Sequence, residues 1–511
     1  MVKSRQGALG DEAPLKPRHH GPDPGPGASS QHGQVGRAAH LKGLTLSKRH
    51  HDAPVELHHE RVSARYRKHV RIRAKRQHGV DGPRDSSTGG PAVAWQDQTA
   101  NEDGVLVCHT ASLMDAVPRA RRYYPHMSTS VLVLGAGFGG LEFSSHLSAL
   151  LGDAVSITLI DRADSFVFGF SKLDVMYGLR ELEDVRLRYA ELVTPGVAFR
   201  QETITSINPE RRSATTNKGT YTADIMVVAL GAEYDTAATP GLDDLGNEFY
   251  SVAGARRLRD VIAAFTHGTA VIGVTSTPFK CPPAPSEAAF LLDESLRQRG
   301  IRDQVQIKVV LPFGRPVPPS PDTSAAILER FAERGIEFVK DHLVTALERN
   351  DDGTRDLVLN DGSRLRYDLF LGIPKHRVPA VVAESGMTDN GWIPVEPRTA
   401  ATRYPGVYAL GDVTSVGTPK AGVFAEGAAN RLAEQTAARL RGAAAMPEGY
   451  DGTGTCWIEF GKGEVGKVAV DFFSVPGQPS GTFWEPTPVT RVEKDAFGAE
   501  RKRRWFGLDR V

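Results

Sequence analysis

The stretch S-V-L-V-L-G-A-G-F-G-G-L-E-F-S-S-H-L-S-A-L-L (Ser130–Leu151) decides the fold of this chain. It follows the pattern G-x-G-x-x-G, begins as an apolar strand and continues as an apolar helix pattern. A second predicted strand, V-S-I-T-L-I-D (Val155–Asp161), ends in an acid 21 residues after the last motif glycine. In such a βαβ unit the loop binds a pyrophosphate at the helix amino end, and the acid binds a ribose. The predicted dinucleotide contacts are Gly135, Gly137, Phe138, Gly139, Gly140, Asp161 and Arg162.

Two later segments predict that this dinucleotide is FAD rather than NAD. The stretch T-A-A-T-R-Y-P-G-V-Y-A-L-G-D-V (Thr399–Val413) resembles the segment that holds the ribityl chain in flavoproteins with two dinucleotide folds. Its contacts would be Gly411 and Asp412. The stretch A-D-I-M-V-V-A-L-G-A (Ala223–Ala232) resembles the strand that returns toward FAD in the same proteins, and it reaches the cofactor at Gly231.

A second βαβ pattern lacks the features that bind a nucleotide. The predicted strand Thr269–Val274 and helix Ser286–Arg299 are joined by T-S-T-P-F-K-C-P-P-A-P (Thr275–Pro285), which has four prolines and no glycine. The next predicted strand, Gln304–Pro312, ends in proline where an acid would bind a ribose. Because proline removes backbone donors, we expect no nicotinamide nucleotide here. The loop is expected instead to position Cys281.

Cys281 has two interpretations. As a redox residue, it has Lys280 beside it and a helix amino end soon after it, and both are expected to lower the pKa of its thiol. The prolines would also stiffen the loop and hold the sulfur against a partner. The alternative is a small buried thiol that only packs. The sequence favours the redox residue.

Five stretches together resemble the sulfide:quinone oxidoreductase and flavocytochrome c sulfide dehydrogenase group of the pyridine nucleotide-disulfide oxidoreductase superfamily. They are G-A-G-F-G-G-L, I-D-R, F-K-C-P-P-A-P-S-E-A-A-F, Y-A-L-G-D-V and P-K-A-G-V-F-A-E (Pro419–Glu426). The resemblance implies an α/β flavoprotein with two Rossmann-like units, FAD, a sulfur donor oxidised near Cys281 and a quinone acceptor. It also implies that Lys420 lies by the isoalloxazine ring, where a cation would stabilise the reduced flavin.

The chain departs from that group in one respect. Fully equipped members carry a second cysteine, expected within Phe370–Val382, and none is present there. Nothing in the sequence places Cys456 at the flavin, and Cys108 lies in the amino-terminal segment. The aromatic run Phe166–Gly178 is either core or a lining of the flavin or quinone site, with Lys172 as its polar group.

Charge divides the chain into two unlike parts. Residues 1–126 hold 20 Lys/Arg, 12 Asp/Glu and 12 of the 16 histidines, whereas the rest holds 42 Lys/Arg and 49 Asp/Glu. The first part lacks hydrophobic periodicity and is predicted to be a disordered leader, with Met127 as the expected true start. A basic arm that binds nucleic acid or a membrane is the alternative; no nucleic-acid partner is expected.

Three cysteines without CxxC spacing predict neither a disulfide framework nor a metal site. No apolar run approaches the ~18–20 residues of a membrane span. A cytoplasmic protein is therefore expected, with peripheral contact on the inner face of the membrane as an open alternative. That contact would use the basic tail Glu500–Leu508. The favoured interpretation of the tail is packing on the body through Trp505 and Phe506.

The predicted organisation is a leader (1–126), a first FAD-binding part (127–240), a second Rossmann-like domain (241–366), a second FAD-binding part (367–440) and a small β appendage (441–511). A homodimer is left open. Two rival functions remain. One is a type II NADH:quinone dehydrogenase, which would need the missing second glycine loop. The other is a non-catalytic, flavin-bound thiol redox sensor.

Overall fold

The computed structural model describes residues 128–508. The predicted leader, the expected start at Met127 and Cys108 lie outside the described residues, and the predictions made for them stay predictions. Among the described helices, none is both long and apolar enough to cross a lipid bilayer.

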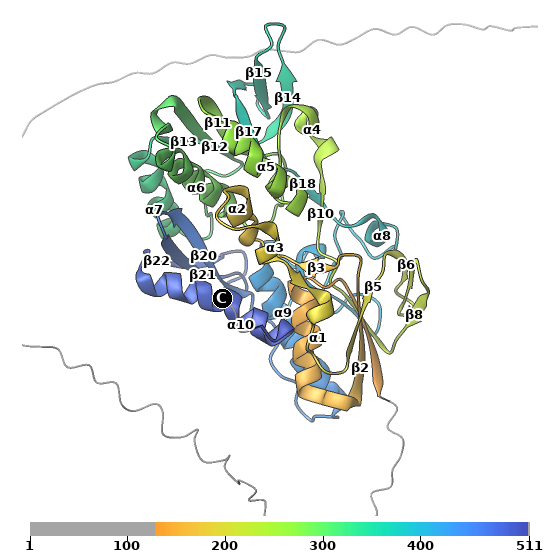
Figure 1. Ribbon diagram of the computed structural model, residues 1–511. Coiled ribbons are helices and arrows are strands. Elements are labelled where there is room, and N and C mark those ends of the chain that lie inside the picture. Colours follow the sequence, from red (N-terminus) through yellow and green to blue (C-terminus); the bar gives the residue numbers. More distant parts are fainter. Residues whose placement is uncertain (1–127, 509–511) are drawn as a thin grey trace, which may run out of the picture. The chain divides into compact units, whose positions relative to one another are not determined.

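A five-stranded parallel sheet carries the glycine motif (Figure 1). Its strands, in spatial order, are β19 (Val407–Ala409), β9 (Ile225–Val228), β1 (Thr129–Leu134), β2 (Val155–Asp161) and β5 (Val197–Gln201). The central strands β1 and β9 carry continuous apolar runs, Val131–Leu134 and Ile225–Val228, which are buried, as parallel strands covered on both faces must be. Because β19 comes from far along the chain, this unit is built from two separate segments.

Two helices pack together on this sheet. They are α1 (Phe138–Leu151), which buries Leu141, Phe143 and Leu147 as predicted, and α9 (Gly422–Leu440). A Cβ atom added to Gly422 would lie 2.5 Å from the Phe138 ring, so the two helices begin side by side. Their amino ends therefore lie together at the carboxyl edge of the sheet.

A second parallel sheet has the order β13 (Ile336–Lys340), β12 (Val305–Leu311), β11 (Gly268–Val274) and β17 (Leu369–Ile373). The helices α5 (Val252–Ala264), α6 (Ala284–Gln298) and α7 (Pro321–Glu333) accompany it. The prediction of an α/β fold with two Rossmann-like units is confirmed. The helix expected at Ser286–Arg299 begins two residues earlier, because Pro285 fits the first turn of a helix, where its missing N–H costs nothing.

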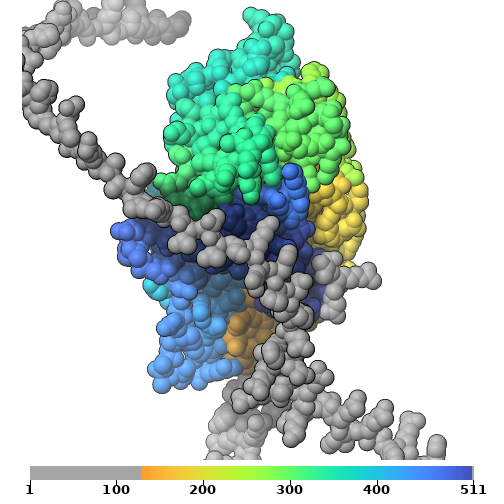
Figure 2. All heavy atoms as spheres, turned by 90° about the vertical axis from the view of Figure 1, so that its left-hand side faces the viewer, coloured from red at the N-terminus to blue at the C-terminus, as the bar shows by residue number. Residues whose placement is uncertain are grey.

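An antiparallel sheet follows, built from β20 (Thr453–Gly461), β21 (Glu464–Asp471) and β22 (Ser480–Trp484). The sequence predicted this β appendage but not the helix that ends it, α10 (Pro488–Phe506). That helix starts with a capping box between Thr487 and Thr490 and ends at Gly507 in a left-handed conformation. In Figure 2 these carboxyl-terminal residues (dark blue) lie between the two parallel-sheet units.

The aromatic residues of the basic tail are packed on the body. Trp505 and Phe506 at the end of α10 are buried in the core of the first sheet. Trp505 donates from Nε1 to Glu142 on α1 (2.9 Å), and Arg504 forms an ion pair with the same carboxylate (2.9 Å). The favoured interpretation of Trp505 and Phe506 is confirmed.

Shorter elements connect these layers. They are β3 (Ser165–Phe166), α2 (Ser171–Met176), α3 (Leu182–Val185), β4 (Leu187–Arg188), β6 (Ile204–Asn208), β7 (Ser213–Thr216), β8 (Thr220–Thr222), β10 (Glu233–Asp235), α4 (Leu242–Leu245), β14 (Val344–Arg349), β15 (Arg355–Leu359), β16 (Arg364–Arg366), β18 (Lys375–Arg377) and α8 (Ala380–Ala383).

Candidate active site

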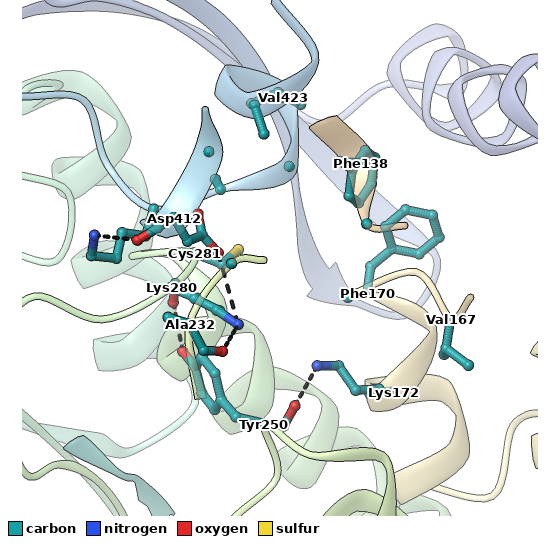
Figure 3. A pocket seen from close by; sticks show the side chains of 18 of the residues that line it. Phe138, Val167, Phe170, Lys172, Ala232, Tyr250, Lys280, Cys281, Asp412 and Val423 are labelled. Atoms are coloured by element: carbon teal, nitrogen blue, oxygen red, sulfur yellow. Dashed lines mark hydrogen bonds and ion pairs between the residues drawn. The ribbon is translucent and has the colours of Figure 1, made fainter. Parts of the chain in front are cut away.

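A cavity of about 420 Å³ lies at the carboxyl edge of the first sheet. Its walls come from the glycine loop, from the Cys281 loop of the second unit and from β20 of the antiparallel sheet. Figure 3 shows Lys280, Cys281 and Asp412 grouped on one side of this space, with Phe138 and Phe170 across from them. Parallel α/β sheets bind their ligands at this edge.

The motif glycines divide into two roles. A Cβ atom at Gly137 would meet no atom within 4 Å, and this residue lines the cavity. A Cβ at Gly140 would lie 1.9 Å from the Gly135 carbonyl oxygen, and one at Gly139 would lie 2.1 Å from the Leu410 side chain. Gly137 therefore leaves room for a ligand, whereas Gly140 allows α1 to approach β1 closely.

The amino end of α1 is left open for an anion. Its N-cap residue, Gly137, makes no side-chain cap, and its first turn carries no acidic residue. The backbone N–H groups of that turn therefore lack side-chain partners, which is the arrangement that binds a phosphate. Phe138 follows, and its ring packs edge-on against Phe166 and Trp505 beside the cavity.

Asp161 lies on the cavity wall, and Arg162 does not. The Asp161 carboxylate accepts from the backbone N–H groups of Ala136 and Ala163, both at 2.8 Å, so it is fixed at the end of β2. Arg162 is exposed and forms an ion pair with Glu233 at 2.9 Å. The sequence motif alone could not show that its side chain points away.

The ribityl-binding segment predicted from Thr399–Val413 reaches the same cavity. Gly411, Asp412 and Gly231 line it, and a Cβ at Gly231 would meet no atom within 4 Å. Two separated carboxylates, Asp161 and Asp412, thus share one cavity with an uncapped helix amino end. This set of groups fits FAD.

Lys420 and Lys280 bring positive charge to the cavity. Lys420 Nζ donates to the carbonyl oxygens of Asp412 (2.7 Å) and Thr414 (3.2 Å) and lies 3.3 Å from the centre of the Trp392 ring. Burial, followed by the nearby Lys280, lowers the pKa of Lys420 to about 8, against the stabilising charge of Asp412. Lys420 is therefore a cation that can lose its proton near neutral pH.

Lys280 points away from Cys281. Its Nζ donates to the Ala232 carbonyl oxygen (2.8 Å) and to the Tyr234 hydroxyl (3.3 Å), and it lies 3.8 Å from the Asp412 carboxylate. Burial lowers the pKa of Lys280, but Tyr234 and Asp412 outweigh it and raise the pKa overall. Lys280 is therefore charged, and its ammonium group lies beside the Asp412 carboxylate rather than beside the Cys281 thiol.

His376 lies against the Cys281 loop and is held neutral. His376 Nδ1 donates to the Pro374 carbonyl oxygen (2.8 Å), and Nε2 accepts from the Lys280 backbone N–H (3.3 Å). Burial, followed by Lys280, lowers the pKa of His376 to about 3, which agrees with an accepting Nε2. His376 therefore offers no base at neutral pH.

The backbone of Cys281 is held by two hydrogen bonds. Cys281 has a φ of 49°, a left-handed conformation that costs an ordinary residue roughly 1 kcal/mol or more. Its N–H donates to the Lys420 carbonyl oxygen (2.8 Å), and its own carbonyl accepts from Ala284 (2.9 Å). The bond to Lys420 ties the Cys281 loop to the segment before α9, next to the sulfur.

The expected lowering of the Cys281 pKa is wrong for this structure. Burial, followed by the carboxyl of Glu287 and by Cys456, raises the pKa of the Cys281 thiol well above its usual value. The amide of Ala284 and Lys172 act in the other direction and are outweighed. The adjacent Lys280 does not help, since its ammonium group is bound elsewhere.

Two site residues were missed by the sequence analysis, Cys456 and Glu287. Cys456 on β20 lines the same cavity as Cys281, and Glu287 in the first turn of α6 lies there too. Glu287 is 4% exposed and accepts from the Glu459 N–H on β20 at 3.0 Å. Burial raises the pKa of Glu287 to about 7. No local signal marks either residue, because strand β20 reaches the site only through tertiary packing.

The aromatic run Phe166–Gly178 contributes both to the core and to the wall of the first cavity. Phe166 and Phe168 are buried and pack around Phe138, so this part is core. Phe170 and Lys172 line the cavity, and Lys172 Nζ donates to the Tyr250 carbonyl oxygen.

A second cavity, of about 490 Å³ and mainly apolar, lies beyond Cys281. Phe279 after β11 and Phe313 after β12 stack across it with ring centres 6.1 Å apart. A nucleotide would bind at these strand ends in an intact Rossmann unit. Four residues line both cavities: Cys281, Lys420, Ala421 and Cys456.

The family model described as pyridine nucleotide-disulphide oxidoreductase matches residues 129–438. The chain belongs to this family. The predictions of an oxidoreductase and of that superfamily are confirmed, and FAD is the cofactor typical of the family's members.

Among curated relatives, the mitochondrial sulfide:quinone oxidoreductase of Mus musculus is 24% identical over 392 residues, which cover 74% of this chain and 84% of that protein. A type II NADH:quinone oxidoreductase of Staphylococcus aureus is 32% identical, but over 130 residues that cover only 25% of this chain and 32% of that protein. The solved sulfide:quinone oxidoreductase of Aquifex aeolicus superposes with a TM-score of 0.64 at 22% identity and covers 74% of this chain and 92% of its own. This structural likeness confirms the fold.

Proposed function

We propose that this oxidoreductase binds FAD, oxidises an inorganic sulfur species such as sulfide at Cys281, and passes the electrons to a quinone. One observation carries the proposal: Cys281 stands between a cavity whose groups fit FAD and a cavity that is mainly apolar. The similarity to sulfide:quinone oxidoreductases supports it.

FAD would be held by Gly137, Asp161, Gly231, Gly411 and Asp412, with the pyrophosphate at the amino end of α1. Bound FAD supplies a two-electron acceptor. Three of the four lysines that line its cavity would place positive charge where the reduced cofactor is negative. They are Lys172, Lys280 and Lys420.

On the sulfur side, oxidation joins the sulfur of hydrosulfide to Cys281 Sγ as a persulfide. One S–S bond forms, one proton leaves, and two electrons pass to the acceptor. Since the pKa of Cys281 is raised, its proton needs an acceptor, and the buried Glu287 carboxyl lines the same cavity. We assign to Glu287 the role of receiving this proton.

On the acceptor side, a quinone takes two electrons and two protons and becomes a quinol. Its ring and apolar tail suit the stacked Phe279 and Phe313 and the proline-rich wall of the second cavity. NADH does not suit this position, because the prolines that precede α6 and line this cavity remove backbone N–H donors that a pyrophosphate would need.

The substitution Cys281→Ser tests the proposal. We expect sulfide-driven quinone reduction to fall by at least about a hundredfold, with FAD content unchanged by absorbance. Cys281→Ala should behave in the same way, since both remove the sulfur. A Cys281→Ser enzyme with wild-type sulfide turnover would remove this residue from the reaction. Turnover that is driven only by NADH would favour the rival dehydrogenase.

A further inference from the structure

Both cysteines within residues 128–508 face the same two cavities. Cys281 and Cys456 are free, partly buried, and separated by 175 positions in sequence. Each lines the cavity that fits FAD, and each also lines the apolar cavity. Two thiols placed together by unrelated parts of a fold form a candidate redox pair.

The strand that carries Cys456 directs it inward. Along β20, side chains alternate between faces, so Cys456 lies on the same face as Ile458 and Phe460. Those two residues are buried in the hydrophobic core of the second unit, and both Cys281 and Cys456 pack against that core. The side chains of Cys281 and Cys456 therefore pack against the same hydrophobic core.

Glu287 joins the two elements that carry the thiols. It lies six residues after Cys281, in the first turn of α6, and it accepts from the N–H of Glu459, three residues after Cys456. Burial, followed by Glu287, raises the pKa of Cys456 to about 12. The Glu287 carboxyl therefore raises the pKa of both cysteines.

We propose that Cys456 is the second sulfur of the active site, and that it forms a reversible disulfide with Cys281 while Glu287 carries the proton between them. The antiparallel sheet would thereby supply the thiol that is missing from Phe370–Val382. The role of sulfide in this scheme rests on the proposed function, but the disulfide itself does not.

The chemistry of the pair balances. Oxidation breaks two S–H bonds, forms one Sγ–Sγ bond, and releases two protons and two electrons. The oxidant is the bound flavin, or diamide in the experiment below. One proton passes to the Glu287 carboxylate and one to solvent. Hydrosulfide then attacks Cys281 Sγ, which forms a persulfide there and expels Cys456 as a thiolate. That thiolate takes its proton back from Glu287.

Peptide mapping of the full-length, FAD-loaded protein tests the pair without requiring turnover. The protein is oxidised with diamide in the absence of sulfide and quinone, its free thiols are alkylated, and the digest is analysed by mass spectrometry. We expect the Cys281 and Cys456 peptides to be recovered joined, and Cys108 to be recovered alkylated. The variant Cys108→Ser should give the same joined peptides, whereas Cys281→Ser and Cys456→Ser should not. Separate, fully alkylated Cys281 and Cys456 peptides after oxidation would overturn the proposal.

Turnover then separates this inference from the proposed function. We expect Cys456→Ser to keep its FAD spectrum and to lose at least about tenfold in sulfide-driven flavin reduction, while Cys108→Ser stays at the wild-type rate. Wild-type rates in both Cys456→Ser and Cys456→Ala would overturn the role of Cys456 and leave the proposed function intact. A joined peptide in a protein that sulfide never reduces would leave the pair intact and remove the proposed function.

Discussion

The two strand–loop–helix junctions of this chain share a scaffold and differ in what their loops present. After β1, the loop presents Gly137 to an open space, and α1 begins with neither a side-chain cap nor an acid. After β11, the loop presents Cys281, and α6 begins directly after Pro283 and carries Glu287 in its first turn. The first junction is built to receive an anion, whereas the second carries a thiol and a buried acid.

The next strand of each unit repeats the contrast. β2 ends at Asp161, which is fixed on the wall of a polar cavity, whereas β12 is followed by Phe313, which stacks on Phe279 in an apolar one. In a Rossmann unit that binds a nucleotide, the residue at the end of this second strand contacts the ribose. A dinucleotide-binding fold can therefore keep its backbone geometry while its phosphate site is replaced by a cysteine and an apolar cavity.

The largest expected effect separates two glycines of the first junction. Gly140→Ala would place a Cβ 1.9 Å from a backbone oxygen, so we expect a loss of about 4 kcal/mol in unfolding free energy, measured by chemical denaturation. Gly137→Ala meets no protein atom and should leave that free energy unchanged. It should nevertheless weaken FAD binding by about tenfold or more, because its methyl group occupies the ligand's space. Equal stability losses in both variants would contradict this division of roles.

Glu287 gives the second junction a pH dependence. Its pKa is about 7 in the folded protein and near 4.5 in the unfolded chain. The unfolded chain therefore releases the proton first, and stability falls as pH rises from about 4.5 to 7, by roughly 3 kcal/mol in total. Denaturation at a series of pH values should show this fall in the wild type, and Glu287→Gln should remove it. Identical pH dependences in the two proteins would mean that this carboxyl is not buried as described.

The apolar cavity predicts a smaller, kinetic effect. Phe313→Ala removes one of two stacked rings, so the KM for quinone should rise about tenfold while anaerobic flavin reduction by sulfide stays unchanged. Phe265→Ala is the matched control, because Phe265 is a partly buried ring that lines neither cavity. A raised KM in the control alone, or slower flavin reduction in Phe313→Ala, would place the acceptor elsewhere.

The smallest effect concerns Arg162, which the motif predicted as a cofactor contact. Since its guanidinium is exposed and paired with Glu233, Arg162→Ala should change FAD affinity by less than about threefold. Titration of the apoprotein with FAD measures this. A change of tenfold or more in FAD affinity would mean that Arg162 contacts the cofactor after all.

The sequence predicted the parts of the site that depend on local pattern. The strand Val155–Asp161, the glycine loop and the altered loop around Cys281 lie where their spacing placed them, because a βαβ unit is a local structure. Cys456 and Glu287 were missed because they meet only when β20 packs against α6. The direction of the Cys281 pKa was wrong for the same reason: burial and Glu287 outweigh the neighbour in sequence.

The most direct test of the account is an anaerobic titration of the purified protein with sulfide and, separately, with NADH, while the visible absorption of the flavin is followed. We predict bleaching or a charge-transfer band with sulfide and no change with NADH, because the second junction holds a thiol and an acid in place of a phosphate site. Bleaching with NADH and none with sulfide would contradict the account and identify a nicotinamide-dependent dehydrogenase.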